Sequence, residues 1–195
     1  QVHAAKLVSG EDVVIKVQKP GVETILYTDL NVLHWATKLL EKAVPKVKFA
    51  SLADIVEEIK NRMVREVDFI EEAKNIDDFV NYLNVTQNNK ATAPKVYHQY
   101  STRRVLTMQR FYGVPLTDFE VVKKLSKDPS QVLITAMNTW FGSLMMCESF
   151  HADLHAGNLM LLEDGRVGFI DFGIVGQLKP EVWTACIAFM DALQK

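Results

Sequence analysis

The stretch SFHADLHAGNLM, residues 149–160, places His151, Asp153 and His155 at every second position, with Asn158 just beyond them. Alternating residues of an extended segment point to one side, so these three side chains could bind one metal ion. On that interpretation the protein would be a metal-dependent hydrolase. The same residues also fit the catalytic loop of a phosphoryl-transfer enzyme. There, an aspartate faces the acceptor and an asparagine holds Mg²⁺.

Two other segments favour the second interpretation. Phosphoryl transfer of the protein-kinase type needs a strand lysine for the nucleotide phosphates and a metal-binding aspartate directly after another strand. VVIK supplies Lys16, and IDFG supplies Asp171. The loop H-A-D-L-H-A-G-N differs from the pattern H-R-D-L-x-x-x-N only by Ala152 in place of arginine. Each match alone fits an ordinary strand lysine or turn, but three matches in chain order indicate phosphoryl transfer.

The elements expected around these motifs follow from hydrophobic spacing and turn residues. Alternating or β-branched runs predict strands at 1–8, 13–18, 95–100, 104–109, 159–162 and 167–170, the last two forming a hairpin. Helical spacing predicts helices at 22–43, from an N-cap at Ser51 to about Leu83, and over most of 116–150. Residues 84–94 form an expected polar loop, and 110–115 form a connector.

This order predicts an α+β, protein-kinase-like fold of two lobes, truncated at both ends. Residues 1–112 would form a small lobe of strands and long helices. Residues 113–195 would form part of a larger, mainly helical lobe that carries the catalytic loop and the D-F-G motif.

Composition excludes several other classes of protein. A formal net charge of −2, without a basic block, gives no footprint for nucleic acid. The two cysteines have no metal-ligand spacing, so reduced thiols in an intracellular compartment are expected. The apolar run 132–147 is interrupted by polar residues and is too short to span a membrane, which favours a buried helix.

The sequence resembles the UbiB family of atypical kinases, also called aarF-domain-containing kinases, over nearly its whole length. The resemblance rests on QVHAA, VVIKVQKPGV, REVDFIEEAKN, RVLTMQRFYGVPL, FHADLHAGNLM and DGRVGFIDFGIVGQL. The loop alone would also suit small-molecule kinases. VQKPGV together with EVDFIEEAKN is what separates the UbiB type from them.

The resemblance implies roles for the catalytic residues. Five glutamates lie on the long helix, and the helical pattern does not say which one meets Lys16. By similarity it is Glu72. Asp153 matches the catalytic aspartate, and Asn158 and Asp171 match the pair that binds Mg²⁺. His151 and His155 would then support the loop rather than bind metal.

The resemblance also implies how ATP would be held. Met108 matches the gatekeeper behind the adenine pocket. The Gln109 carbonyl and the Phe111 N–H would meet the adenine edge, and Glu66 and Asp68 form an E-x-D motif directed toward the active site.

The family's known activities set the remaining expectations. They imply ATP hydrolysis more than phosphorylation of proteins, with Mg²⁺ as the metal, in prenyl-quinone (ubiquinone) or lipid metabolism. A quinone-pathway molecule or protein complex is the implied partner, with peripheral membrane association of the parent protein. The sequence of residues 139–158 resembles that of plastid members, which favours a plastid over a mitochondrion as the location of the protein. No Gly-rich phosphate loop is present in the sequence, which begins where that loop would end. This piece alone is therefore expected to be inactive even if its parent protein is an enzyme. The alternative function is a nucleotide-binding, pseudokinase-like regulatory module.

Overall fold

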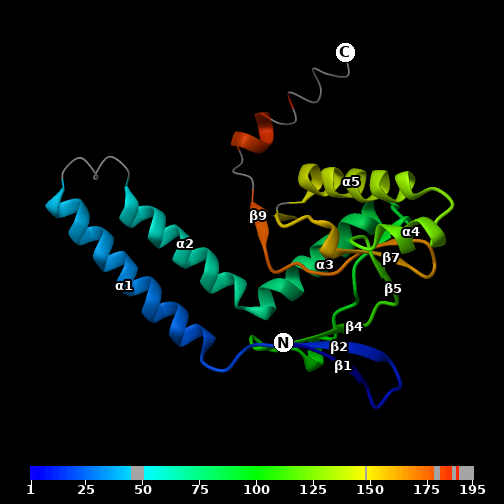
Figure 1. Cartoon of the computed structure of the whole chain (residues 1–195), viewed down its shortest axis with the longest axis horizontal. Helices are drawn as coiled ribbons and strands as arrows, with labels where there is room; N and C mark the ends of the chain where they lie inside the picture. The colour runs from blue at the N-terminus through cyan, green and yellow to red at the C-terminus, as the bar shows by residue number, and fades with distance from the viewer. Residues whose placement is uncertain (45–50, 148, 178–180, 186–187, 189–195) are drawn as a thin grey trace.

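The computed structural model describes residues 1–44, 51–147, 149–177, 181–185 and 188. Three small sheets and five main α-helices make up most of this part of the chain, and residues 181–185 are also helical (Figure 1). The helices are α1 (Val22–Ala43), α2 (Leu52–Glu66), α3 (Phe69–Val85), α4 (Phe119–Leu125) and α5 (Pro129–Met146). Two short 3₁₀ turns, η2 (His98–Tyr100) and η3 (Ala156–Asn158), complete the helical elements.

The strands form sheets of three, four and two members. The first sheet is antiparallel, with order β1 (Val2–Lys6), β2 (Asp12–Val17), β4 (Val105–Gln109). The second has the order β3 (Ala91–Thr92), β8 (Val167–Phe169), β7 (Leu159–Leu162), β5 (Gly113–Pro115). The third pairs β6 (Ser149–His151) with β9 (Val175–Gln177). The expected α+β class and the hairpin of β7 with β8 are therefore confirmed.

Helix α3 runs between the three-stranded sheet and α5, and it supplies much of the core (Figure 1). Its buried side chains recur at helical spacing and include Ala73, Ile76, Phe79 and Leu83. They pack with Leu106 of β4 and Phe169 of β8 in one hydrophobic cluster. The core therefore joins the sheet that carries Lys16 to the hairpin that precedes Asp171.

The expected single helix from Ser51 to Leu83 is wrong, because the chain breaks after α2. Asp68 has extended backbone angles, φ −95° and ψ 104°, and its side chain accepts the Ile70 N–H at 3.0 Å. Asp68 is thus the N-cap of a separate helix, α3. Ser51 does lie at the start of α2, where its carbonyl accepts the Ile55 N–H at 3.0 Å.

Three shorter expectations also differ from the structure. Residues 95–100 do not form a strand: only Val96 bridges Met108, and the chain then turns through η2. This turn is held by the Ser101 hydroxyl, which donates to the Tyr97 carbonyl at 2.9 Å. The expected loop 84–94 contains the end of α3 and the strand β3, and the expected connector contains β5, which pairs with β7.

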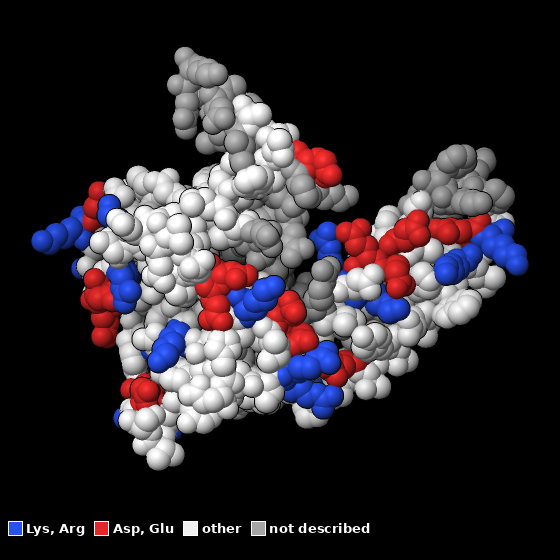
Figure 2. All heavy atoms as spheres, turned by 180° about the vertical axis from the view of Figure 1, so that it is seen from behind, with Lys and Arg blue, Asp and Glu red and all other residues white. Residues whose placement is uncertain are grey.

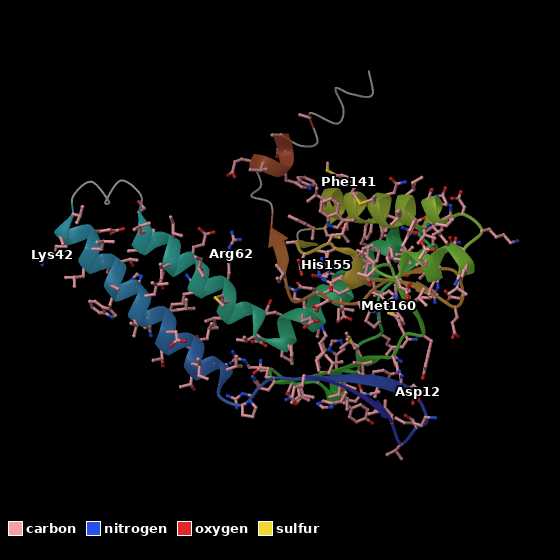
Figure 3. All side chains as sticks on the ribbon, in the orientation of Figure 1. Asp12, Lys42, Arg62, Phe141, His155 and Met160 are labelled. Carbon is pink, nitrogen blue, oxygen red and sulfur yellow. The ribbon has the colours of Figure 1, made fainter. Side chains whose placement is uncertain are left out.

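Helix α5 is buried on one face only. Its inner face consists of Val132, Ala136, Thr139 and Ser143, whereas large apolar side chains such as Phe141 lie exposed on the outer side (Figure 3). The expectation of a buried helix thus holds for half of its circumference. In the described part of the chain, no helix is both long and apolar enough to cross a membrane.

The inner face of α5 approaches α3 closely at Gly142. A Cβ atom at that position would lie 2.1 Å from the Tyr82 hydroxyl oxygen, so the contact requires glycine. The same hydroxyl donates to the Thr139 carbonyl at 3.0 Å. This contact fixes α5, and the loop 151–158 that follows it, against the helix that carries Glu72.

Candidate active site

Lys16 joins two acidic residues that are far away in the sequence. Its ammonium nitrogen lies 2.5 Å from Glu72 Oε1 and 3.3 Å from Asp171 Oδ1. The Lys16 side chain is 12% exposed and that of Glu72 is 4% exposed, whereas Asp171 is about half exposed. The structure thus brings together three of the residues predicted from the sequence, one from β2, one from α3 and one after β8.

The buried Glu72 carboxyl accepts hydrogen bonds from two donors. Oε1 accepts the Lys16 ammonium and the Phe172 N–H, the latter at 3.4 Å. Burial raises the pKa of the Glu72 carboxyl, and the adjacent Lys16 ammonium opposes that rise. A buried carboxylate needs such partners, because leaving either charge unpaired would be costly.

The loop 151–158 brings Asp153 and Asn158 together. The Asn158 amide nitrogen donates to the Asp153 carbonyl at 3.1 Å and to its carboxylate Oδ2 at 3.3 Å. The loop itself is closed by His155, whose Nδ1 accepts the Gly157 N–H at 3.0 Å. His155 Nε2 lies 3.5 Å from Asp153 Oδ2. These contacts support the expectation that His155 shapes the loop.

His151 is a buried part of the framework, with 2% of its surface exposed. Its Nδ1 accepts the Asp153 N–H at 3.2 Å, and its carbonyl accepts the indole N–H of Trp140 at 2.7 Å. The ring lies 5.2 Å from that of Phe172, centroid to centroid. Within the described residues Nε2 has no hydrogen-bond partner, and burial lowers the pKa of the His151 imidazole. The neutral imidazole of His151 is therefore the form that fits this buried position.

This burial predicts that the protein loses stability in mild acid. The unfolded imidazole has a pKa near 6.5, and the folded one is lower, so the unfolded chain binds the proton more readily. The contribution to the free energy of unfolding is therefore complete above pH 6.5 and is lost as the pH falls through the folded pKa. Urea unfolding of wild type and His151→Asn at pH 7.5 and 5.5 checks this.

Between pH 7.5 and 5.5, the free energy of unfolding should change less in His151→Asn than in the wild type. His98→Asn is the matched control, because His98 is exposed and pairs with the exposed Asp77. An equal pH dependence in wild type and His151→Asn would contradict the assignment.

The residues expected at the adenine edge lie where β4 ends. Met108 is buried in the core cluster, opposite Val14 of β2. The Gln109 N–H is used internally, because it donates to the Lys95 carbonyl at 2.8 Å. Phe111 packs over Gly168, where a Cβ would lie 3.1 Å from its ring. These positions fit the expected roles, which stay predictions.

Asp68 of the E-x-D motif is used structurally. Besides capping α3, its Oδ2 lies 2.9 Å from Nε of Arg103. Neither contact reaches Lys16, Glu72 or Asp171. The cofactor role expected of Asp68 stays a prediction. Glu66 is the last residue of α2, and its side chain lies outside the described part of the structure.

The metal-site interpretation of His151, Asp153 and His155 finds no geometric support. The His151 ring is buried against Phe172, whereas His155 is exposed and uses Nδ1 to cap η3. No group of three or more His, Cys, Asp or Glu side chains able to hold a metal ion occurs among the described residues. Alternation along the chain did not place the three side chains in one cluster.

Comparison with known proteins decides the family. The family model of the ABC1 atypical kinase-like domain matches residues 1–195. The chain belongs to the ABC1 atypical kinase-like family. The resemblance to aarF-domain-containing, UbiB-type kinases is thereby confirmed.

Relatives of this ABC1 chain include plant and bacterial proteins. An uncharacterised aarF domain-containing protein kinase of Arabidopsis thaliana, described as chloroplastic, is 52% identical over 99% of this chain and 36% of its own length. A probable protein kinase UbiB of Azotobacter vinelandii is 32% identical over 93% of this chain and 34% of its own length. The ABC1 chain therefore spans about a third of these relatives.

A solved structure confirms the kinase-like fold class of the ABC1 chain. The complex of Rv3197 with erythromycin from Mycobacterium tuberculosis matches with a TM-score of 0.72 and 28% identity. The match covers 91% of this chain and 43% of that one. The expected lobe boundary between residues 112 and 113 stays a prediction. One sheet crosses it, because β3 from residues 1–112 pairs with β8 from residues 113–195.

The donor set of the ABC1 chain fits Mg²⁺ carried by a nucleotide. Mg²⁺ prefers oxygen ligands and takes one or two from protein beside phosphates and waters. Asn158 turns its amide nitrogen toward Asp153, so its amide oxygen remains available. Both described contacts of the Asp171 carboxylate, to Lys16 and to the Gly173 N–H, involve Oδ1. One amide oxygen and one carboxylate oxygen are thus left for the metal.

Sequence reasoning assigned no role to two residues of the site. Asn75 donates to the Phe172 carbonyl at 3.2 Å, and Trp140 donates to His151. The signal for Asn75 was its place three residues after Glu72, on the same side of a helix. Trp140 gave no such signal, because it meets His151 only when α5 folds back against β6.

Proposed function

We propose that this chain is the nucleotide-binding part of a UbiB-type enzyme that uses Mg-ATP. The reaction is ATP hydrolysis or transfer of the terminal phosphoryl group, linked to prenyl-quinone or lipid metabolism. The observation that supports this best is the Lys16 ammonium in contact with both Glu72 and Asp171. Those contacts join a strand lysine, a helix glutamate and the D-F-G aspartate, as nucleotide binding of the kinase type requires.

The mechanism assigns a separate task to each group. Lys16, fixed by Glu72, presents a positive charge to the nucleotide phosphates. Asn158 and Asp171 would hold Mg²⁺, which neutralises charge on the phosphate oxygens when bound. Asp153, about half exposed, orients the hydroxyl or water that attacks and accepts its proton. His155 and Asn158 keep the Asp153 carboxylate in place.

The cellular setting follows from the relatives and is part of the same proposal. Two Arabidopsis relatives are described as chloroplastic, and one of them is named Protein ACTIVITY OF BC1 COMPLEX KINASE 1. We therefore infer a plastid protein whose partner is a quinone-pathway or lipid molecule, or a complex that handles one. On the face seen in Figure 2, basic residues lie beside acidic ones rather than in one patch, which does not favour nucleic acid.

A thermal shift of the full-length protein tests nucleotide binding. Mg-ATP at 100 times its dissociation constant should add about 2.7 kcal/mol to the free energy of unfolding of the wild type. Asp171→Asn should abolish the shift, because the metal loses its carboxylate ligand. Asp128→Asn is the matched control, since Asp128 only caps α5 and asparagine caps equally well. Stoichiometric zinc or iron with no shift by ATP would instead favour the hydrolase.

A further inference from the structure

The peptide groups around Phe172 are held on both sides by one helix. The Phe172 N–H donates to Glu72 Oε1 at 3.4 Å, and the Phe172 carbonyl accepts the side-chain amide of Asn75 at 3.2 Å. Both partners lie on α3, three residues apart, and therefore on one face of the helix. Among the described residues, these two hydrogen bonds tie the D-F-G backbone to α3.

The same face of α3 also holds the Phe172 ring. Phe79, one turn beyond Asn75, lies 5.1 Å from Phe172, centroid to centroid. Phe172 is fully buried, so the ring cannot shift without opening the core. Ring and backbone of this one residue are thus fixed together by Glu72, Asn75 and Phe79.

The residue directly before Phe172 is Asp171, which is proposed to bind the metal. Asp171 lies outside the strands, after β8 has ended, so no sheet ladder fixes its peptide. Its side chain reaches Lys16 and the Gly173 N–H. The preceding Ile170 N–H donates to the Asn158 carbonyl at 3.1 Å, and the following Phe172 backbone is held by α3. The hold on Phe172 therefore contributes to the orientation of the Asp171 carboxylate.

We propose that Asn75 is a positioning residue for Mg²⁺ binding: by holding the Phe172 carbonyl, it fixes Asp171 in the orientation that accepts the metal. This inference rests on the proposed function. It couples the position of α3 to metal affinity by a contact that is separate from the Lys16–Glu72 pair. The described hydrogen bond of the Asn75 side chain goes to the Phe172 carbonyl and not to Lys16, Asn158 or Asp171, so its removal should affect Mg²⁺ binding through the position of Asp171.

Binding of ATP with and without Mg²⁺ to the full-length protein tests the inference. Asn75→Leu keeps the size of the side chain but removes the amide donor. It should raise the Mg²⁺ concentration needed for half-saturation of ATP binding about three- to tenfold, which is the effect of losing one hydrogen bond. The affinity for ATP in the presence of EDTA should stay within about twofold, since Lys16 and Glu72 are intact.

Two further variants complete the design. Asn81→Leu is the matched control, because Asn81 lies exposed on the same helix, and it should leave the Mg²⁺ requirement unchanged. Asn75→Ala is the second variant if Asn75→Leu does not fold, and it should show the same rise in the Mg²⁺ requirement.

Three outcomes would overturn the inference, and they are distinguishable. An unchanged Mg²⁺ requirement in the Asn75 variants would show that the contact does not position Asp171. An equal loss of ATP affinity with and without Mg²⁺ would make Asn75 a general structural residue. A wild type that binds no ATP under either condition would overturn the proposed function itself, and the metal role of Asp171 with it.

Discussion

Asp153→Asn is expected to lower ATP turnover by the full-length protein about 10²- to 10⁴-fold, the usual contribution of a positioned general base. The side chain keeps its size, and an amide oxygen can still accept the hydrogen bond that Asn158 now donates to Asp153 Oδ2 at 3.3 Å. What is lost is the negative charge that orients and deprotonates the acceptor. Mg-ATP affinity should change by no more than about threefold, because this group acts mainly in the transition state. Steady-state turnover and a binding titration on the same preparation check both parts.

Asp128→Asn serves again as the control, being the same substitution at a helix cap away from the site. If Asp153→Asn turned over ATP at the wild-type rate, the catalytic assignment would be wrong. A wild type that binds Mg-ATP without measurable turnover would instead support the nucleotide-binding regulatory module. The experiment therefore separates an enzyme from a pseudokinase-like protein.

The parts of the site that the sequence predicted best are those set by local geometry. Asp153 and Asn158 lie five residues apart in one loop, so their contact follows from the loop motif. The pairing of Lys16 with Glu72 spans 56 residues, and helical periodicity offered five glutamates for it. Only the family resemblance singled out Glu72, because long-range pairing depends on how α3 docks on the sheet.

Helix α1 shows a second limit of sequence patterns. Its bounds follow from the spacing of its apolar residues, but its inward face combines the buried Leu30 with polar residues, while larger apolar side chains stay exposed. His34 Nδ1 lies 3.2 Å from the Ala53 carbonyl, and Glu41 accepts the Ala53 N–H, whereas Trp35 is 71% exposed. Periodicity defines a helix and its apolar stripe, but the contact face depends on the neighbour.

The break between α2 and α3 has a related cause. The periodic run through 52–83 reads as one helix, since Asp is only mildly unfavourable inside a helix. In the structure, Asp68 finds two partners that the helix interior would deny it, the Ile70 N–H and the Arg103 side chain. Arg103 lies 35 residues away, so this competition was invisible in the local sequence.

The second large effect is expected in the aromatic core beneath the site. Phe169 and Phe172 are both fully buried, and both pack on Phe79, at centroid distances of 4.8 and 5.1 Å. Replacing either by alanine removes a ring from a closed core and should lower the free energy of unfolding by about 3–5 kcal/mol. Such a loss is a large part of the 5–15 kcal/mol typical of a domain, so denaturant unfolding will detect it readily.

The two phenylalanines form a matched pair, because they differ in what they hold. Phe169 is in β8, whose backbone is fixed by its ladder with β7, whereas the Phe172 backbone is fixed by α3. The milder substitutions Phe169→Leu and Phe172→Leu should therefore lower stability similarly, but only Phe172→Leu should also reduce the thermal shift produced by Mg-ATP. Equal shifts in both variants would mean that Asp171 keeps its orientation without a well-packed Phe172. A reduced shift in Phe172→Leu alone would show that the core under α3 tunes the metal site, because the residue that fills the core is also the neighbour of the metal ligand.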